Sequence, residues 1–208
     1  MKKEINVLTT PLSVGLSAGQ QFGSGWTDGS DLVTQTRGVY SFYNKAAKLF
    51  HAYATGLTIP VVAAQMVSVF SVYNPIGSNY DIELVDLEFG NVNATTVVNT
   101  IGLCFESGLS VVPIAANQTQ GTAYSGYLTG NNTQTGNFFT AWTHVGTPIR
   151  LGPLVTYGAV TNTTAGRIGV DLNGKIILAP GSVISLCTST ATETNAAAHV
   201  SYMLTSTT

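Results

Sequence analysis

The chain has 208 residues and a formal net charge of −2, and only 9% of its residues are Asp, Glu, Lys or Arg, against about 25% in an ordinary soluble domain. This length allows one large domain with its own core, and the lack of any basic stripe argues against binding to a nucleic-acid backbone. A polar but nearly uncharged surface gives little protection against association, so we expect an assembly protein and not an enzyme.

The first 35 residues are predicted to form an extended arm and loop, because they show neither helical nor strand periodicity. Trp26, in a polar context, either anchors an interface or covers one end of its own core. The interface residues expected from this arm are Lys2, Lys3, Ile5 and Trp26. We expect no secretory leader, since the two lysines are not followed by an apolar core. The long uncharged run 49–80 is interrupted by prolines and is no membrane span.

Residues 38–56 are the one stretch where helix and strand compete. Phe42, Leu49 and Tyr53 fall on one face at helical spacing, and Gly56 could end such a helix. The alternation of Leu49, His51 and Tyr53 also fits a strand. We favour a strand with a break near Asn44-Lys45, in which His51 is a structural histidine.

Residues 66–90 are predicted to form two strands joined by the turn 74–79, which contains Asn74, Pro75 and Gly77. The first strand, Met66 to Tyr73, has large apolar residues at both parities, so it should be covered on both faces. The second alternates apolar and acidic residues, with a slip at Val85-Asp86 that predicts a bulge. Its acidic side chains are expected on a solvated outer face, and they are Asp81, Glu83, Asp86 and Glu88.

Further strands are predicted at 97–107, 137–142 and 149–157, with a long loop region and short strands over 108–140. The two cysteines, Cys104 and Cys187, lie in apolar strand contexts, where buried free thiols are expected.

The last third of the chain has the strongest turn signal. Asn173-Gly174 stands between the apolar runs 167–172 and 175–178, and this dipeptide suits a two-residue hairpin because both of its residues tolerate positive φ. Strands at 183–187 and 198–204 follow. Many short strands with frequent turns predict an all-β chain, an antiparallel β-sandwich of jelly-roll-like topology formed by residues 36–208 after the arm 1–35.

Segments that imitate catalytic motifs lack the context that the chemistry needs. Residues 15–19 match G-x-S-x-G, but no helix period follows Ser17. Residues 169–175 match most of a phosphate-binding loop, but Ile176 stands where a magnesium-binding Ser or Thr is required. The histidines are scattered and form no metal-binding pair. We therefore expect no catalytic, cofactor-binding or metal-binding residues and no small-molecule substrate.

Several turn segments, in their order and spacing over about residues 38–204, resemble virion structural proteins of tailed bacteriophages. They are Gly38-x-Tyr40, Phe50, Gly56-Leu57-x-Ile59-Pro60, Tyr73-Asn74-Pro75-Ile76-Gly77-Ser78 and the run from Asp171 to Ser185. The resemblance implies a jelly-roll-like sandwich within a particle that is assembled in the host cytoplasm. It implies no catalytic residues.

Within that family we expect a capsid decoration or cement protein, a homotrimer whose partners are the major capsid protein or other virion proteins, with no nucleic-acid or membrane partner. One alternative is a receptor- or carbohydrate-binding module of a tail or fibre, in which aromatic side chains stack on sugars; the candidates are Trp26, Tyr124, Tyr127 and Trp142. Another is the shell-forming capsid subunit itself.

Overall fold

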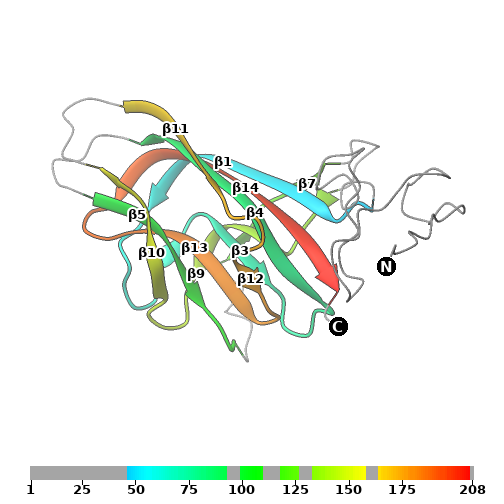
Figure 1. Ribbon diagram of the computed structural model, residues 1–208. Helices are drawn as coiled ribbons and strands as arrows, with labels where there is room; N and C mark the ends of the chain where they lie inside the picture. The colour runs from blue at the N-terminus through cyan, green and yellow to red at the C-terminus, as the bar shows by residue number, and fades with distance from the viewer. Residues whose placement is uncertain (1–45, 93–98, 110–117, 127–132, 158–163, 207–208) are drawn as a thin grey trace, which may run out of the picture. The chain divides into compact units, whose positions relative to one another are not determined.

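Two antiparallel sheets make up the described part of the chain in this computed structural model, and they lie as two layers (Figure 1). The structure describes residues 46–92, 99–109, 118–126, 133–157 and 164–206. The chain divides into the units Met1–Ala46 and Ala47–Thr208, so almost everything described belongs to the second unit. The predicted arm 1–35 and its boundary with the sandwich lie outside the described residues.

The first sheet has a path of six strands and one further short strand. Its order is β11 (Thr164–Asp171), β4 (Tyr80–Val92), β14 (Glu193–Ser206), β1 (Leu49–Ile59), β7 (Ala123–Ser125) and β8 (Thr133–Gln134), with β12 (Ile177–Leu178) also paired to β4. The second sheet has the order β10 (Ile149–Tyr157), β5 (Asn99–Glu106), β13 (Ser182–Thr188), β3 (Ser71–Asn74), β9 (Phe138–Thr143) and β2 (Val67–Ser68), with β6 (Thr119–Gln120) also paired to β9.

The long strands pair in a nested way. β1 pairs with β14, β3 with β13, β4 with β11, and β5 with β10. Each early strand therefore pairs with a late one, and the pair β5–β10 is the innermost along the chain. This nesting is the double Greek key of a jelly roll, which confirms the predicted fold class. No helix occurs among the described residues. The insertion from β6 to β9 adds strands beside β1 in one sheet and beside β3 in the other.

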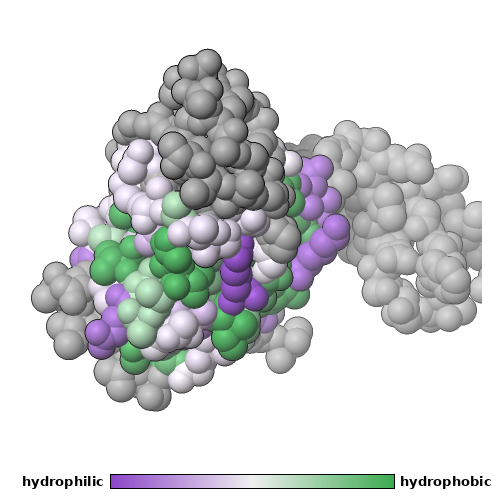
Figure 2. Space-filling model, turned by 90° about the vertical axis from the view of Figure 1, so that its left-hand side faces the viewer, coloured by the Kyte–Doolittle hydropathy of each residue, from purple (hydrophilic) through white to green (hydrophobic). Residues whose placement is uncertain are grey.

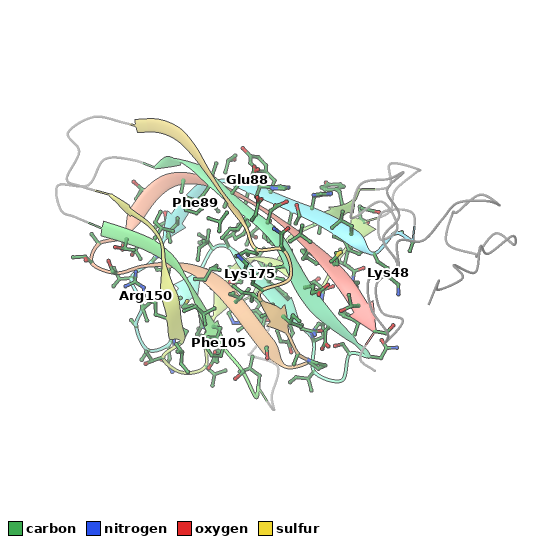
Figure 3. All side chains as sticks on the ribbon, viewed as in Figure 1. Lys48, Glu88, Phe89, Phe105, Arg150 and Lys175 are labelled. Carbon is green, nitrogen blue, oxygen red and sulfur yellow. The ribbon has the colours of Figure 1, made fainter. Side chains whose placement is uncertain are left out.

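The main core lies between the two sheets, where one parity of each strand points inward. Figure 3 shows Glu88 and Phe89, neighbours on β4, on opposite faces of their sheet, with Phe89 in the interior. The rings of Phe70 and Phe138 meet edge to face at 5.0 Å. Other members of this core include Phe50, Ile59, Ile82, Leu84, Ile101, Leu186 and Tyr202.

The outer face of the second sheet is buried as well. Residues before and within β2 and those after β9 pack on it, so that Met66 covers the thiols of Cys104 and Cys187, while Trp142 packs against Tyr73 at 4.6 Å. All four residues of β3 are buried, which confirms the two-sided covering. The single strand expected over 66–73 is in fact β2 and β3, separated by a bend where the hydroxyl of Ser68 bonds to the backbone of Phe70.

The turn after β3 carries the chain from one sheet to the other. The buried Asn74 amide donates to the carbonyls of Tyr80 (2.9 Å) and Leu178 (2.7 Å), and its Oδ1 accepts from Ser78 Oγ at 2.6 Å. Gly77 has φ of +76°, a backbone conformation that is unfavourable for residues with a Cβ. The predicted turn therefore exists, and its amide hydrogen bonds tie both layers together.

The predicted hairpin at Asn173-Gly174 is wrong. Both residues do have positive φ, 46° and 73°, but β11 and β12 both pair with β4 and not with each other. The Val85 carbonyl accepts from the N–H groups of Leu172 and Asn173, so the loop closes against the bulge at Val85 and the chain continues along the same strand. That bulge is confirmed by a register shift between Ser201 and Tyr202, the partners of Asp86 and Leu84.

The strand interpretation of residues 49–56 is confirmed by β1, where Gly56 (φ +65°) sits at a register shift between Ala54 and Leu57. The break expected near Asn44-Lys45 lies outside the described residues, which begin at Ala46. The strands predicted at 97–107, 137–142, 149–157, 183–187 and 198–204 correspond to β5, β9, β10, β13 and β14.

Candidate functional site

Polar and aromatic side chains form two rows across the outer face of the first sheet. In one row, Tyr124 on β7 lies opposite His51 on β1, which lies opposite Ser201 on β14 and then Asp86 on β4. In the other row, Tyr53 lies opposite His199 and then Glu88. Paired residues in a sheet share a face, so these seven side chains form one surface, which we call the tyrosine–histidine strip.

Strand alternation explains why these residues face outward. Their neighbours on the same strands, such as Ala52, Val200 and Leu87, are buried in the core between the sheets. The bulge at Val85 restores the alternation on β4, so Asp86 and Glu88 stay on the outer face with the acidic residues before the bulge. The prediction of a solvated acidic face on this strand is confirmed, because these carboxylates are half-buried while their neighbours are buried.

The centre of the strip is tightly packed. The rings of His51 and His199 stack with centroids 5.6 Å apart and 12° between their planes. His51 Nδ1 hydrogen-bonds Ser201 Oγ at 2.9 Å, so His51 has the structural partner that its sequence context suggested. Burial, followed by the charge of His199, lowers the pKa of His51, and the charge of Asp86 partly offsets this.

His199 faces two carboxylates without a good hydrogen bond to either. Its Nδ1 lies 3.5 Å from Asp86 Oδ1 and 4.0 Å from Glu88 Oε2. The Asp86 Oδ1 and His199 Nδ1 atoms are both buried and have no hydrogen-bond partner, so at 3.5 Å their contact is electrostatic only. The three side chains are 28–30% exposed, so they remain accessible from solvent at the surface of the strip.

Two tyrosine rings stand out from this polar floor. Tyr53 is 62% exposed and Tyr124 is 59% exposed, although both sit in regular strands. Exposed aromatic rings beside half-buried polar groups combine an apolar contact surface with fixed hydrogen-bonding groups, which is the usual composition of ligand sites.

A second polar cluster lies on the covered outer face of the other sheet. His144 Nδ1 is 3.1 Å from Glu106 Oε2 and its Nε2 is 2.9 Å from Ser185 Oγ, which lies 2.7 Å from Ser71 Oγ. Burial lowers the pKa of His144, and the hydrogen bond to Glu106 offsets part of this. Because a carboxylate only accepts, the neutral ring carries its proton on Nδ1 and accepts from Ser185 at Nε2.

This cluster, Glu106–His144–Ser185, has the connectivity of a hydrolytic triad, but its setting is a closed interior. His144 is fully buried and Ser185 is 1% exposed, so a substrate carbonyl cannot reach the hydroxyl. Glu106 also accepts from the backbone N–H groups of Val145 and Gly146. The cluster thus fixes the segment after β9 onto the sheet.

The thiols of Cys104 and Cys187 are buried and free, as predicted. Each sulfur donates to a backbone carbonyl, Cys104 to Ser185 and Cys187 to Gly102. The neighbouring Cys187 thiol and burial raise the pKa of Cys104, so this thiol is unreactive at neutral pH.

The residues predicted from sequence fall in three groups. The interface residues Lys2, Lys3, Ile5 and Trp26 lie outside the described residues, as does Tyr127. Of the other proposed sugar platforms, Tyr124 is exposed, whereas Trp142 is fully buried. That candidate is wrong because the Trp142 ring packs against the rings of Tyr73 and Phe139. The remaining residues of the strip and the residues of the triad-like cluster were not predicted as sites. They are brought together by the register between distant strands, which no local sequence motif indicates.

Among the described residues, no group of three or more His, Cys, Asp or Glu side chains is arranged to hold a metal ion. Nor does the described part of the chain contain a helix with the length and apolar character that crossing a membrane requires.

No protein family matches this chain, and no curated protein and no solved structure matches it.

Proposed function

We propose that the chain is a non-enzymatic virion structural protein, a capsid decoration or cement protein that stabilises a phage head. The observation that supports this best is the nested pairing of β1 with β14, β3 with β13, β4 with β11 and β5 with β10, the topology of many viral capsid domains. Since a fold alone does not establish function, the surface properties must agree with the proposal.

The surface agrees in its low charge and in its exposed apolar side chains. Ile149 is 62% exposed and Leu151 is 47% exposed on β10, an edge strand of the second sheet. Figure 2 faces the side where β10 and Arg150 lie in Figures 1 and 3, and it shows apolar surface between polar residues. A surface of this kind is suited to burial against a neighbour.

The β10 edge itself is poorly suited to adding a strand from another chain. Register shifts flank Gly152 (φ +128°) and Pro153, and proline has no N–H to donate to a ladder. Bulges and prolines are standard protection of edge strands. Association at this side would therefore use side-chain contacts and not continuous β-pairing.

A cement protein acts by linkage. It binds the assembled shell better than the free subunits, so each bound copy shifts the equilibrium towards the shell. Many copies on one lattice need only modest individual affinity.

Gradient-purified particles from the source phage test the proposal directly. We expect the chain to copurify with intact heads and antibody labelling to place it on the capsid face, and the free chain should sediment with three times the 21.7 kDa chain mass. Absence from heads would overturn the proposal, and closed particles formed by the chain alone would identify it as the shell subunit.

The predicted arm contacts are tested by charge reversal. The double variant Lys2→Glu/Lys3→Glu should lose head binding if the arm is the tether. The double variant Lys48→Glu/Lys175→Glu makes the same change of charge at two exposed residues of the sandwich, and it should bind like the parent chain. Equal binding by both variants would contradict the tether.

A further inference from the structure

We propose that the tyrosine–histidine strip binds a neutral oligosaccharide chain. This goes beyond the structural role proposed above and does not depend on it, because the strip lies on the first sheet and its chemistry is complete within one chain.

The two exposed tyrosines provide the apolar contacts. The C–H faces of sugar rings stack on flat aromatic surfaces, and Tyr offers such a surface with little loss of side-chain entropy. Tyr124 is paired with His51, two residues before Tyr53, so the tyrosines occupy diagonal positions, roughly 7–8 Å apart. That separation suits a short chain of linked sugar units, with a ring under each of two units.

The floor of the strip provides the hydrogen-bonding groups. Asp86 and Glu88, at 30% and 28% side-chain exposure, offer carboxylate oxygens that accept from sugar hydroxyls. His199 lies between these carboxylates and Tyr53, its partner on β1. The histidine stack and the Ser201 bond hold this floor in one geometry, which lowers the entropic cost of binding.

The charge of the sheet selects among sugars. Asp171 is paired with Asp86 and is exposed, and Asp81 and Glu83 continue the acidic row on β4. Five carboxylates on one face repel sialylated, uronic-acid, sulfated or phosphate-bearing chains. The predicted ligand is therefore uncharged.

Native affinity electrophoresis tests the strip, with the full chain run through gels that contain soluble mannan, β-glucan or galactan. We expect retardation by at least one of these neutral probes and none by polygalacturonate or polysialic acid. Tyr53→Ala and Tyr124→Ala should each weaken binding by roughly tenfold, as loss of one stacked ring requires.

Matched variants separate binding from folding. Tyr53→Phe and Tyr124→Phe keep the rings and should bind nearly as the parent does, and Ile177→Ala, an exposed apolar residue of the same sheet, should not change binding. Circular dichroism establishes that each variant is folded. No retardation by any neutral probe, retardation only by anionic probes, or equal binding by the two alanine variants and the parent would each overturn the proposal.

Discussion

The imidazole of His144 lies 2.9 Å from the hydroxyl of Ser185, and neither side chain has meaningful access to solvent. The pair joins β13 to the segment that follows β9 and links onward to Glu106 and Ser71. A catalytic connectivity thus serves here to satisfy buried polar groups, each of which would be costly if left unpaired.

The position of each serine in this chain of hydrogen bonds predicts different costs for their removal. Ser185→Ala leaves both His144 Nε2 and the Ser71 hydroxyl without a partner, so it should lower the free energy of unfolding by about 2–3 kcal/mol. Ser71→Ala removes only the end of the chain and should cost about 1 kcal/mol. Urea denaturation of both variants measures the difference, with Thr122→Ala at an exposed loop position as the control. A larger loss for Ser71→Ala than for Ser185→Ala would contradict the proposed direction of the bonds.

The lowered pKa of His144 predicts a loss of stability in acid. Because its pKa is lower in the folded than in the unfolded state, the unfolded chain binds more protons below about pH 6.5, and stability falls from there down to the folded-state pKa. His144→Gln cannot titrate. We expect the difference in free energy of unfolding between parent and variant to shrink from about pH 7.5 to about pH 5.

Thermal or urea unfolding at several pH values gives that difference. A gap that widens in acid would mean that Glu106 outweighs burial and raises the pKa of His144, so that the folded protein holds a protonated imidazole.

Asn74 provides a test of the turn between the sheets. Asn74→Asp keeps the shape but replaces an amide that donates to Tyr80 and Leu178 with a carboxylate that faces the same two carbonyls. Loss of both bonds and burial of an unpaired charge should cost about 3–5 kcal/mol at neutral pH, and less as the carboxyl is protonated. Ser78→Ala, which removes one bond to Asn74 Oδ1, should cost only about 1 kcal/mol. Chemical denaturation at two pH values measures both, and a pH-independent loss for Asn74→Asp would rule out the charge explanation.

Sequence predicted what depends on local patterning. Alternation identified β1, β4 and β5, and the slip at Val85-Asp86 marked a real bulge. Turn chemistry gave φ correctly at Asn173 and Gly174 but not the pairing partner, because positive φ specifies the bend of the backbone and not which strand accepts its hydrogen bonds. The predicted hairpin failed for this reason.

The candidate sites depend on register between distant strands, which local patterns do not contain. Tyr53 and His199 are neighbours because β1 pairs with β14, and Glu106 meets His144 only after the insertion packs on the second sheet. Trp142 illustrates the same limit: its strand was predicted, but its burial results from packing against Tyr73 and Val183, which strand pairing places nearby, and against Phe139 and Leu109.

The contact between β5 and β10 depends on a glycine. A Cβ at Gly102 would lie 2.4 Å from the backbone oxygen of Gly152, and a backbone atom cannot move aside as a side chain can. Gly102→Ala should therefore displace β10 and cost about 2–4 kcal/mol. Gly146→Ala is the matched control, since its Cβ would meet only Glu106 Oε1 at 3.6 Å. Hydrogen exchange should show β10 amides losing protection in the first variant alone, and unchanged protection would contradict the close approach.

For two buried tyrosines, Tyr202 and Tyr73, we expect the loss of the hydroxyl to change the free energy of unfolding in opposite directions. The Tyr202 hydroxyl lies in the core between the sheets without a hydrogen-bond partner, and burial raises the pKa of this phenol. Tyr202→Phe removes an unsatisfied polar group and should leave stability unchanged or raise it by about 1 kcal/mol. Tyr73→Phe deletes the acceptor of the Ile76 N–H at 3.1 Å and should lower stability by about 1 kcal/mol. Urea denaturation of the two variants compares the same chemical change in two settings; a clear destabilisation by Tyr202→Phe would mean that its hydroxyl has a partner, such as a bound water.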